Sequence, residues 1–190
     1  MNLLLVSMIT VIFLIIAIPL NAEAQKGWKT HVVEDEFSFT YPATWDLTER
    51  ENRFTSVDAS LTYEKGDTSA SIILESGPDL LSALEVEDDN SILSILERIM
   101  ESAYEDSNKF ESGVDKYIIN NQTAPYTIST FSKKNIFGYE HDYVVMVIAI
   151  KMDQDLLLGQ FISTEDDFDR LLKSAEKIFK SIRPVSSTIT

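Results

Sequence analysis

The 190-residue sequence predicts an α+β fold, in which a mostly antiparallel β-sheet is covered by amphipathic helices. Three observations point to this fold. Several stretches alternate apolar and polar residues and are joined by short turn sequences, which is typical of antiparallel hairpins. Two other stretches repeat their apolar residues at helical spacing. Each of these helices needs an apolar surface to cover, and a sheet with both faces covered supplies one.

The first strand is predicted in the stretch FSFTYPATW, residues 37–45. Phe37, Phe39 and Tyr41 share one face, while the serine and threonine between them point to the other face. The proline that follows lacks an amide hydrogen, so it closes the strand or lies at an edge. We expect Trp45 to follow a turn and to pack back onto the sheet.

A hairpin is predicted over residues 60–76, with its turn at Lys65-Gly66-Asp67. Its second strand alternates through Ala70, Ile72 and Leu74, which places these three side chains on one face. Gly77-Pro78 ends the pattern.

The first clear helix is predicted from Ser91 to about Glu105. Its apolar residues recur every three or four positions and form one stripe. The stripe consists of Ile92, Ile95, Leu96, Ile99, Met100 and Ala103.

Residues 110–163 predict a run of antiparallel strands. Turns are expected at Asn120-Asn121, Phe137-Gly138 and Asp153-Gln154, between segments rich in β-branched and aromatic residues. The continuous apolar run at residues 143–150 is too short to span a membrane. It predicts a central strand that is covered on both faces.

The last helix has the clearest pattern. Thr164 and Asp167 resemble a capping box, and Pro184 is expected to stop the helix. Acidic residues occupy its first turn and basic residues its last, as the helix dipole favours. The predicted apolar face consists of Phe168, Leu171, Leu172, Ala175, Ile178, Phe179 and Ile182.

Together these features resemble the PsbP-like family over most of residues 28–183. The specific part is the F-x-F-x-Y-P-x-x-W stretch: Phe37, Phe39, Tyr41, Pro42 and Trp45, supported by Phe179 and Ile182 near the end. PsbP-like proteins are relatives of the extrinsic oxygen-evolving subunit of photosystem II, and they share an α/β/α sandwich with the Ran-binding Mog protein. The resemblance implies this fold and a non-enzymatic accessory or binding domain. Because the matching residues are packing residues, they imply a fold more than a function.

The N-terminus carries an uncharged apolar run over residues 3–20, followed by Ala22-Glu23-Ala24. The small-x-small site favours a signal peptide, residues 1–24, that is cleaved before Gln25. The length of the run also fits an uncleaved membrane anchor. Both interpretations place a single domain, residues 25–190, outside the cytoplasm, either secreted or tethered to the membrane.

The formal charge of −15 argues against nucleic acid and anionic lipid headgroups as partners. The lack of cysteine excludes thiol catalysis, cysteine-ligated zinc and iron–sulfur clusters. The predicted partner is an unidentified protein at the membrane or cell surface. An acidic surface is also compatible with cationic partners or divalent ions.

Calcium is the best candidate ion, because it prefers hard oxygen ligands. The acidic loop before Ser91 offers Glu85, Glu87, Asp88 and Asp89 as candidate ligands. The loop lacks the D-x-[DN]-x-[DN]-G pattern, and solvated charge at a helix start explains the same residues. No cofactor is otherwise predicted.

The sequence supports no enzyme assignment. It contains no G-x-S-x-G, G-x-G-x-x-G, H-E-x-x-H or phosphate-binding loop. A secreted hydrolase using paired carboxylates is a weaker alternative. His31 and His141 are read as edge or surface histidines; the neighbours of His141 on its strand, Glu140 and Asp142, point to the opposite face.

Two further features stay open at this level. Asn121 begins an N-x-T sequon on a predicted turn, so it is a candidate glycosylation site. Some aromatic residues outside the core pattern could line a recognition surface, although packing at the sheet margins is the simpler interpretation. They are Trp28, Tyr104, Phe137 and Tyr139.

Overall fold

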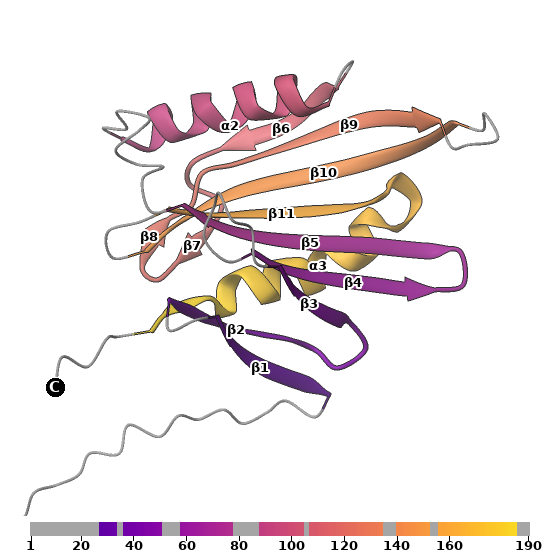
Figure 1. Ribbon diagram of the computed structural model, residues 1–190. Coiled ribbons are helices and arrows are strands. Elements are labelled where there is room, and N and C mark those ends of the chain that lie inside the picture. Colours follow the sequence, from indigo (N-terminus) through magenta and orange to yellow (C-terminus); the bar gives the residue numbers. More distant parts are fainter. Residues whose placement is uncertain are drawn as a thin grey trace, which may run out of the picture.

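The computed structural model describes residues 27–33, 36–50, 58–77, 88–104, 107–134, 140–152 and 156–185. Its centre is a seven-stranded sheet in the order β3-β4-β5-β11-β10-β9-β6, in which every neighbouring pair is antiparallel. A three-stranded sheet, β1-β2-β12, and a two-stranded hairpin, β7-β8, accompany it (Figure 1). This arrangement confirms the predicted α+β fold.

The element bounds follow the chain in order. The strands are β1 (Trp28–Val33), β2 (Phe37–Pro42), β3 (Asp46–Arg50), β4 (Asp58–Lys65), β5 (Thr68–Gly77), β6 (Asn108–Gly113), β7 (Ile118–Ile119), β8 (Gln122–Thr123), β9 (Tyr126–Lys134), β10 (Glu140–Lys151), β11 (Leu156–Thr164) and β12 (Arg183–Pro184), and the helices are α2 (Asp89–Ala103) and α3 (Glu165–Ser181).

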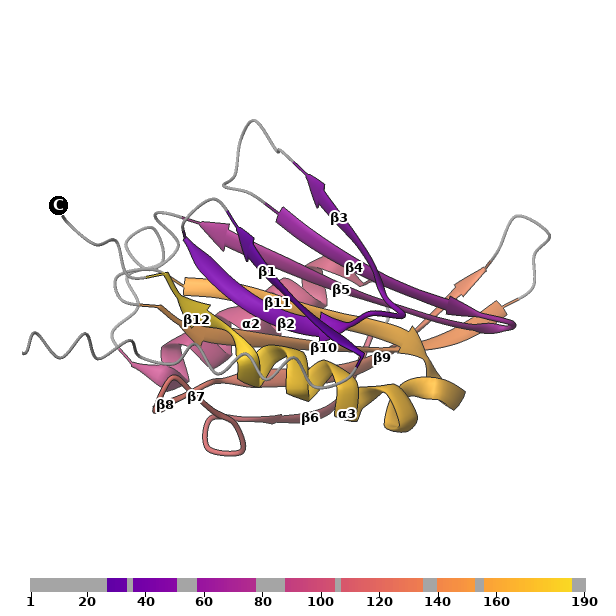
Figure 2. The ribbon, with the colours of Figure 1, turned by 90° about the horizontal axis from the view of Figure 1, so that it is seen from below.

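The two helices lie on opposite faces of the large sheet. Helix α2 packs on β9 and β10, whereas α3 packs on β11, β10 and β5 and also against β2 (Figures 1 and 2). Strand β10 shows the division, because its successive side chains point to opposite faces. Met146 and Ile148 join the α3-side core, whereas Val145 and Val147 join the core under α2. The prediction of a central strand covered on both faces is therefore confirmed.

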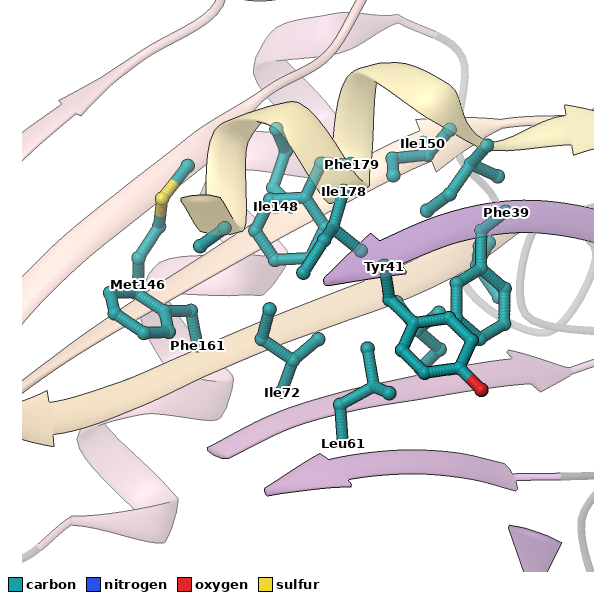
Figure 3. Packing of buried hydrophobic residues seen from close by; sticks show 14 of the residues in the cluster. Phe39, Tyr41, Leu61, Ile72, Met146, Ile148, Ile150, Phe161, Ile178 and Phe179 are labelled. Carbon is teal, nitrogen blue, oxygen red and sulfur yellow. The ribbon is translucent and has the colours of Figure 1, made fainter. Parts of the chain in front are cut away.

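The α3-side core contains the aromatic residues of the first predicted strand. Phe37, Phe39 and Tyr41 on β2 are buried, and Trp45 is buried beyond the turn that follows. Figure 3 shows Phe39 and Tyr41 beside side chains of α3 and of the large sheet. The predicted packing of this stretch is confirmed.

Two predicted turns are confirmed with their backbone geometry. The β4–β5 hairpin pairs Lys65 with Thr68, and Gly66 has a φ of 64°, which glycine tolerates at this position of a two-residue loop. Asn120 and Asn121 both have positive φ, 53° and 61°, as a type I′ turn requires. The turns predicted at residues 137–138 and 153–154 lie outside the described residues.

Helix α2 differs from its prediction in bounds and in the width of its buried stripe. It begins at Asp89 rather than Ser91 and ends at Ala103. Only Ile92, Leu96 and Met100 are buried, because the helix rests on one face of a sheet and presents one narrow stripe to it. Ile99 is 36% exposed, and Ala103 is also exposed, so the predicted stripe was too wide.

Helix α3 keeps its predicted apolar face, and only its ends differ. The Thr164 hydroxyl donates to the Asp167 carboxylate and makes no capping bond to the backbone. The helix ends at Ser181, and Pro184 belongs to β12, which pairs with β2.

Candidate functional site

A small hollow lies between helix α2 and strands β6 and β9. Its volume is about 50 Å³, enough for a few water molecules or a small polar head group. It is lined by Glu97, Met100, Glu101, Ser107, Lys109, Thr127 and Ser129. Polar side chains therefore predominate where helix and sheet would otherwise form a dry core.

Strand β9 contributes two buried hydroxyl groups to this hollow. Thr127 and Ser129 are 1% and 2% exposed. The Thr127 hydroxyl oxygen has no hydrogen-bond partner among the described residues. Because a buried hydroxyl without a partner costs about 1–3 kcal/mol, this group is suited to a hydrogen bond with something that enters the hollow.

A carboxylate and an ammonium group border the hollow. Glu97 Oε1 accepts from Lys109 Nζ at 3.0 Å and from the Ser112 hydroxyl at 2.9 Å. The bond from Lys109 lowers the pKa of Glu97, burial opposes this, and the bond from Ser112 lowers it further. Glu97 is therefore ionised at neutral pH. With Glu101 also lining the hollow, two carboxylates face one lysine, so the local charge is negative.

Beside the hollow, strand β6 forms one edge of the large sheet. It pairs with β9 and with no other strand of the described chain. The ladder register shifts between Lys109 and Glu111, which leaves Phe110 as the extra residue of a β-bulge. Phe110 is 68% exposed, and it directly follows Lys109 of the hollow. A single exposed ring is common on protein surfaces, but on an unpaired edge strand it lies where an extended partner segment can add to the sheet.

The structure describes two of the four predicted calcium ligands, and these two bond to different groups. Glu85 and Glu87 lie outside the described residues. Asp88 is the N-cap of α2 and accepts from the Ser91 amide at 2.8 Å and from the Ser91 hydroxyl at 3.0 Å. Asp89 accepts from Lys151 and Thr123. Both aspartates thus serve the start of α2, and calcium binding stays a prediction.

Asp88 and Asp89 are both ionised at neutral pH for local reasons. The Ser91 amide and hydroxyl lower the pKa of Asp88. Burial raises the pKa of Asp89, but the bonds from Lys151 and Thr123 outweigh it and lower the pKa. In the part of the chain that the structure describes, no three histidine or acidic side chains gather as a metal site would require.

His31 and Tyr104 have structural neighbours. His31 Nε2 lies 2.7 Å from Glu49 Oε1, and its ring meets Phe39 edge-on. His141 is exposed on β10. Tyr104 stacks on Phe131 with 4.4 Å between ring centroids. Residues 137 and 139 lie outside the described ranges.

Asn121 lies on the exposed turn between β7 and β8, where a glycan would have room. Its glycosylation stays a prediction. Among the described residues, no helix is long and apolar enough to cross a membrane, and the segment predicted as a leader, residues 1–24, is outside them.

Sequence reasoning missed the hollow. Thr127 and Ser129 alternate with Tyr126 and Ile128, a pattern that resembles a strand with one solvent-facing side. Helix α2 covers that side, so hydroxyl groups that would be solvated are buried. A signal was present in the serine and threonine of β9, but their burial depends on where α2 packs.

Comparison with known proteins identifies the fold. No protein-family model matches the sequence, and no curated protein matches it significantly. Among solved structures, the cyanobacterial PsbP protein of Synechocystis sp. PCC 6803 is similar with a TM-score of 0.54 and 13% identity, over 83% of this chain and 92% of that one. A Pseudomonas aeruginosa protein of unknown function, described as a putative regulator, has a TM-score of 0.52 and 9% identity, over 81% and 94%.

The Ran-binding protein Mog1p of Saccharomyces cerevisiae is also similar, at a TM-score of 0.48 and 12% identity, over 85% of this chain and 97% of that one. At such identities a likeness concerns the fold alone. The sheet order, the helices on opposite faces and the first two similarities agree with one another. The chain has the PsbP-like fold that its sequence resemblance implied.

Proposed function

We propose that this chain is a non-enzymatic, extracytoplasmic binding domain whose protein partner docks on the β6 edge and places a basic side chain in the hollow. The observation that supports this most directly is the unpartnered, buried hydroxyl of Thr127 in a hollow that Glu97 and Glu101 also line, beside the edge strand that carries the exposed Phe110. The PsbP-like fold is compatible with such a role but does not specify it.

The chemistry of the hollow selects the partner's side chain. An ammonium or guanidinium group offers donors to Glu97, to Glu101 and to the Thr127 hydroxyl oxygen. Hydrogen bonds from a cation to a carboxylate are stronger than bonds between neutral groups. The hollow of about 50 Å³ accepts the head group, and the rest of the partner's chain would remain outside, along β6.

The edge strand supplies the remaining contact area. Phe110 offers an apolar anchor, and aromatic residues at the centre of an interface commonly carry much of the binding energy. The outer side of β6 also leaves main-chain groups that an extended partner segment can pair with.

Placement outside the cytoplasm rests on the apolar leader and its Ala-x-Ala site. Mass spectrometry of the exported protein distinguishes a chain that begins at Gln25 from one that retains residues 3–20. A tagged chain that stays in the cytosol would contradict this part of the proposal.

Photo-crosslinking in the source cells tests the docking surface. A photoreactive amino acid replaces Phe110 in one variant and the exposed turn residue Asp67 in a control. We expect one discrete adduct from position 110 and none from position 67. Glu97→Gln with Glu101→Gln should abolish that adduct, whereas the matched exposed pair Glu64→Gln with Glu140→Gln should leave it unchanged. Equal adducts at both positions, or equal effects of the two pairs, would reject the proposal.

A small cation in the same hollow is a second candidate, which the same buried hydroxyl and carboxylates favour. Calorimetric titration with calcium chloride distinguishes a cation site in the hollow from the calcium site predicted in the acidic loop before Ser91. Loss of binding in Glu97→Gln assigns the ion to the hollow, and loss in Asp88→Asn with Asp89→Asn assigns it to the loop. Heat that is unchanged in both variants rejects both sites.

A further inference from the structure

A cluster of basic side chains occupies the C-terminal half of α3 and the chain beside it. We call this cluster the basic face. It consists of Lys116, Lys173, Lys177, Lys180 and Arg183, all of them exposed. In Figure 2, β1 lies on one side of α3, and the β7–β8 hairpin lies near the C-terminal end of the helix.

Specific contacts join the three elements that form this face. Lys177 Nζ lies 4.4 Å from the ring centroid of Trp28 on β1. Lys116 and Lys180 lie 5.5 and 5.7 Å from the ring centroid of Tyr117, which precedes β7. Arg183 donates to the Asn120 side chain at 3.2 Å, on the β7–β8 turn. These contacts link four of the five bases, and Lys173 lies one helical turn before Lys177 on α3, so the five bases lie on neighbouring parts of one surface.

The face keeps a positive excess after its acids are included. Glu111 is paired with Lys116, and Glu176 accepts from the Tyr117 hydroxyl at 2.9 Å. Asp115 and Asp169 are the other acids there, and both are exposed; Asp169 lies one helical turn before Lys173. Among the described residues, five bases against four acids leave a local excess of one positive charge in a chain of net charge −15. The acidic first turn of α3 lies at the opposite end of the helix.

Apolar side chains accompany the bases. Ile118 on the β7–β8 hairpin is 55% exposed, and Trp28 is partly exposed beneath Lys177. Basic residues interspersed with a partly exposed tryptophan and an exposed isoleucine are typical of surfaces that rest on a lipid headgroup layer, where tryptophan is favoured.

We propose that the basic face rests on an anionic membrane surface, with the acidic remainder of the domain turned away from it. Charge complementarity supports this orientation, because an anionic leaflet attracts the basic face and repels the rest of the chain. The position of the leader supports it as well. Only residues 21–27 separate the apolar run from Trp28, so a retained anchor holds this face within roughly 25–30 Å of the bilayer. The proposal does not depend on docking at the β6 edge.

Tryptophan quenching by brominated lipid tests the contact. The full chain is measured with phosphatidylcholine vesicles, with and without phosphatidylglycerol, whose acyl chains carry bromine. Trp28→Phe identifies the signal of Trp28 against that of the buried Trp45. We expect quenching of Trp28 with the anionic vesicles, and its loss when salt rises from about 0.1 to about 1 M, because the Debye length falls from about 10 to about 3 Å.

A charge-reversal pair with a matched control makes the test specific. Lys173→Glu with Lys180→Glu should weaken the anionic-vesicle interaction by about tenfold or more. Lys65→Glu with Lys133→Glu is the control, because it changes the net charge by the same amount at exposed residues outside the basic face. This control pair should leave the interaction with anionic vesicles within about twofold of the unmodified protein. Equal quenching on both kinds of vesicle, or equal effects of the two pairs, overturns the proposal. If Trp28 is protected only by an acidic protein and never by lipid, the face is a protein-docking surface and the membrane assignment is wrong.

Discussion

The two covered faces of the seven-stranded sheet differ in what lies beneath their helices. Under α3, β2 and the large sheet bury a continuous apolar cluster that includes Phe37, Phe39, Phe161 and Phe179. Under α2 the cluster is smaller, and the hollow with its two buried hydroxyl groups interrupts it beside β6 and β9. We therefore expect apolar burial to contribute more to the free energy of unfolding on the α3 side. On the α2 side, a polar site takes the place of part of the apolar packing.

The aromatic residues make the same contrast. Phe161 and Phe168 stack on the α3 side with 5.4 Å between ring centroids, inside the core. On the α2 side Tyr104 and Phe131 also stack, with 4.4 Å between ring centroids, but both stay partly exposed, and on the edge strand β6 the ring of Phe110 is 68% exposed. Rings that are buried in the α3-side core are not available to a partner. We therefore expect a partner to bind on the α2 side, where aromatic side chains are partly or largely exposed.

The largest expected effect is the loss of a ring from the α3 side. Phe179→Ala removes a 1% exposed side chain from the cluster and should lower the free energy of unfolding by about 3–5 kcal/mol. Denaturant unfolding measures this change. Ile99→Ala on α2, where the side chain is 36% exposed, is the control and should have a much smaller effect. Equal losses in both variants would remove the contrast between the two faces.

Gly159 gives a second test of the comparison, because the ring of Phe179 on α3 packs directly against this position of β11. A Cβ atom there would lie 2.7 Å from Phe179 and 3.1 Å from Ile148. We expect Gly159→Ala to destabilise the fold by about 1–3 kcal/mol, measured by the shift in the denaturation midpoint. Gly113→Ala, whose Cβ would lie 3.4 Å from Tyr126, should cost less. If Gly113→Ala destabilises the fold more than Gly159→Ala does, the close contact between Gly159 and Phe179 is contradicted.

Thr127→Val changes stability in the opposite direction on the α2 side. It replaces an unpartnered buried hydroxyl with a methyl group of similar size, so it should raise the free energy of unfolding by about 1 kcal/mol. The same variant should weaken the proposed adduct at position 110, because the partner loses an acceptor. Thermal unfolding and crosslinking are measured on one preparation. A destabilised variant would show that the hydroxyl is already satisfied.

The smallest effect concerns acid pH. The pKa of Glu97 is held below its usual value of 4.5 in the folded chain, so its ion pair contributes stability above that pH and loses it as the pH falls through the lower, folded pKa. Unfolding measured between neutral pH and about pH 3 should show this loss, and Glu97→Gln should flatten part of it. Glu64→Gln, an exposed control, should keep the full slope. Identical slopes for all three proteins would contradict the pairing with Lys109.

Much of the fold could be predicted because local patterns determine local structure. Alternation placed Phe37, Phe39 and Tyr41 on one face, and helical spacing identified the buried side of α3. The same reasoning made the stripe of α2 too wide, since periodicity shows which residues can be buried but not how much sheet the helix will meet. Helix α3 ends at Ser181, before Pro184, and the residues that follow it, Arg183 and Pro184, pair with β2, which no local pattern indicated.

By itself, the sequence determined the two helices, the β4–β5 hairpin, the central strand and much of the apolar core, because each follows from side-chain periodicity within a short segment. Strands β1, β3 and β12 were not predicted from it. Tertiary structure alone decided the two candidate surfaces. The hollow exists because α2 covers hydroxyl groups of β9 that would otherwise be solvated. The basic face exists because folding brings Lys116 beside the end of α3. Net charge is a property of the whole chain, whereas attraction to a partner depends on which charges the fold places together within a Debye length.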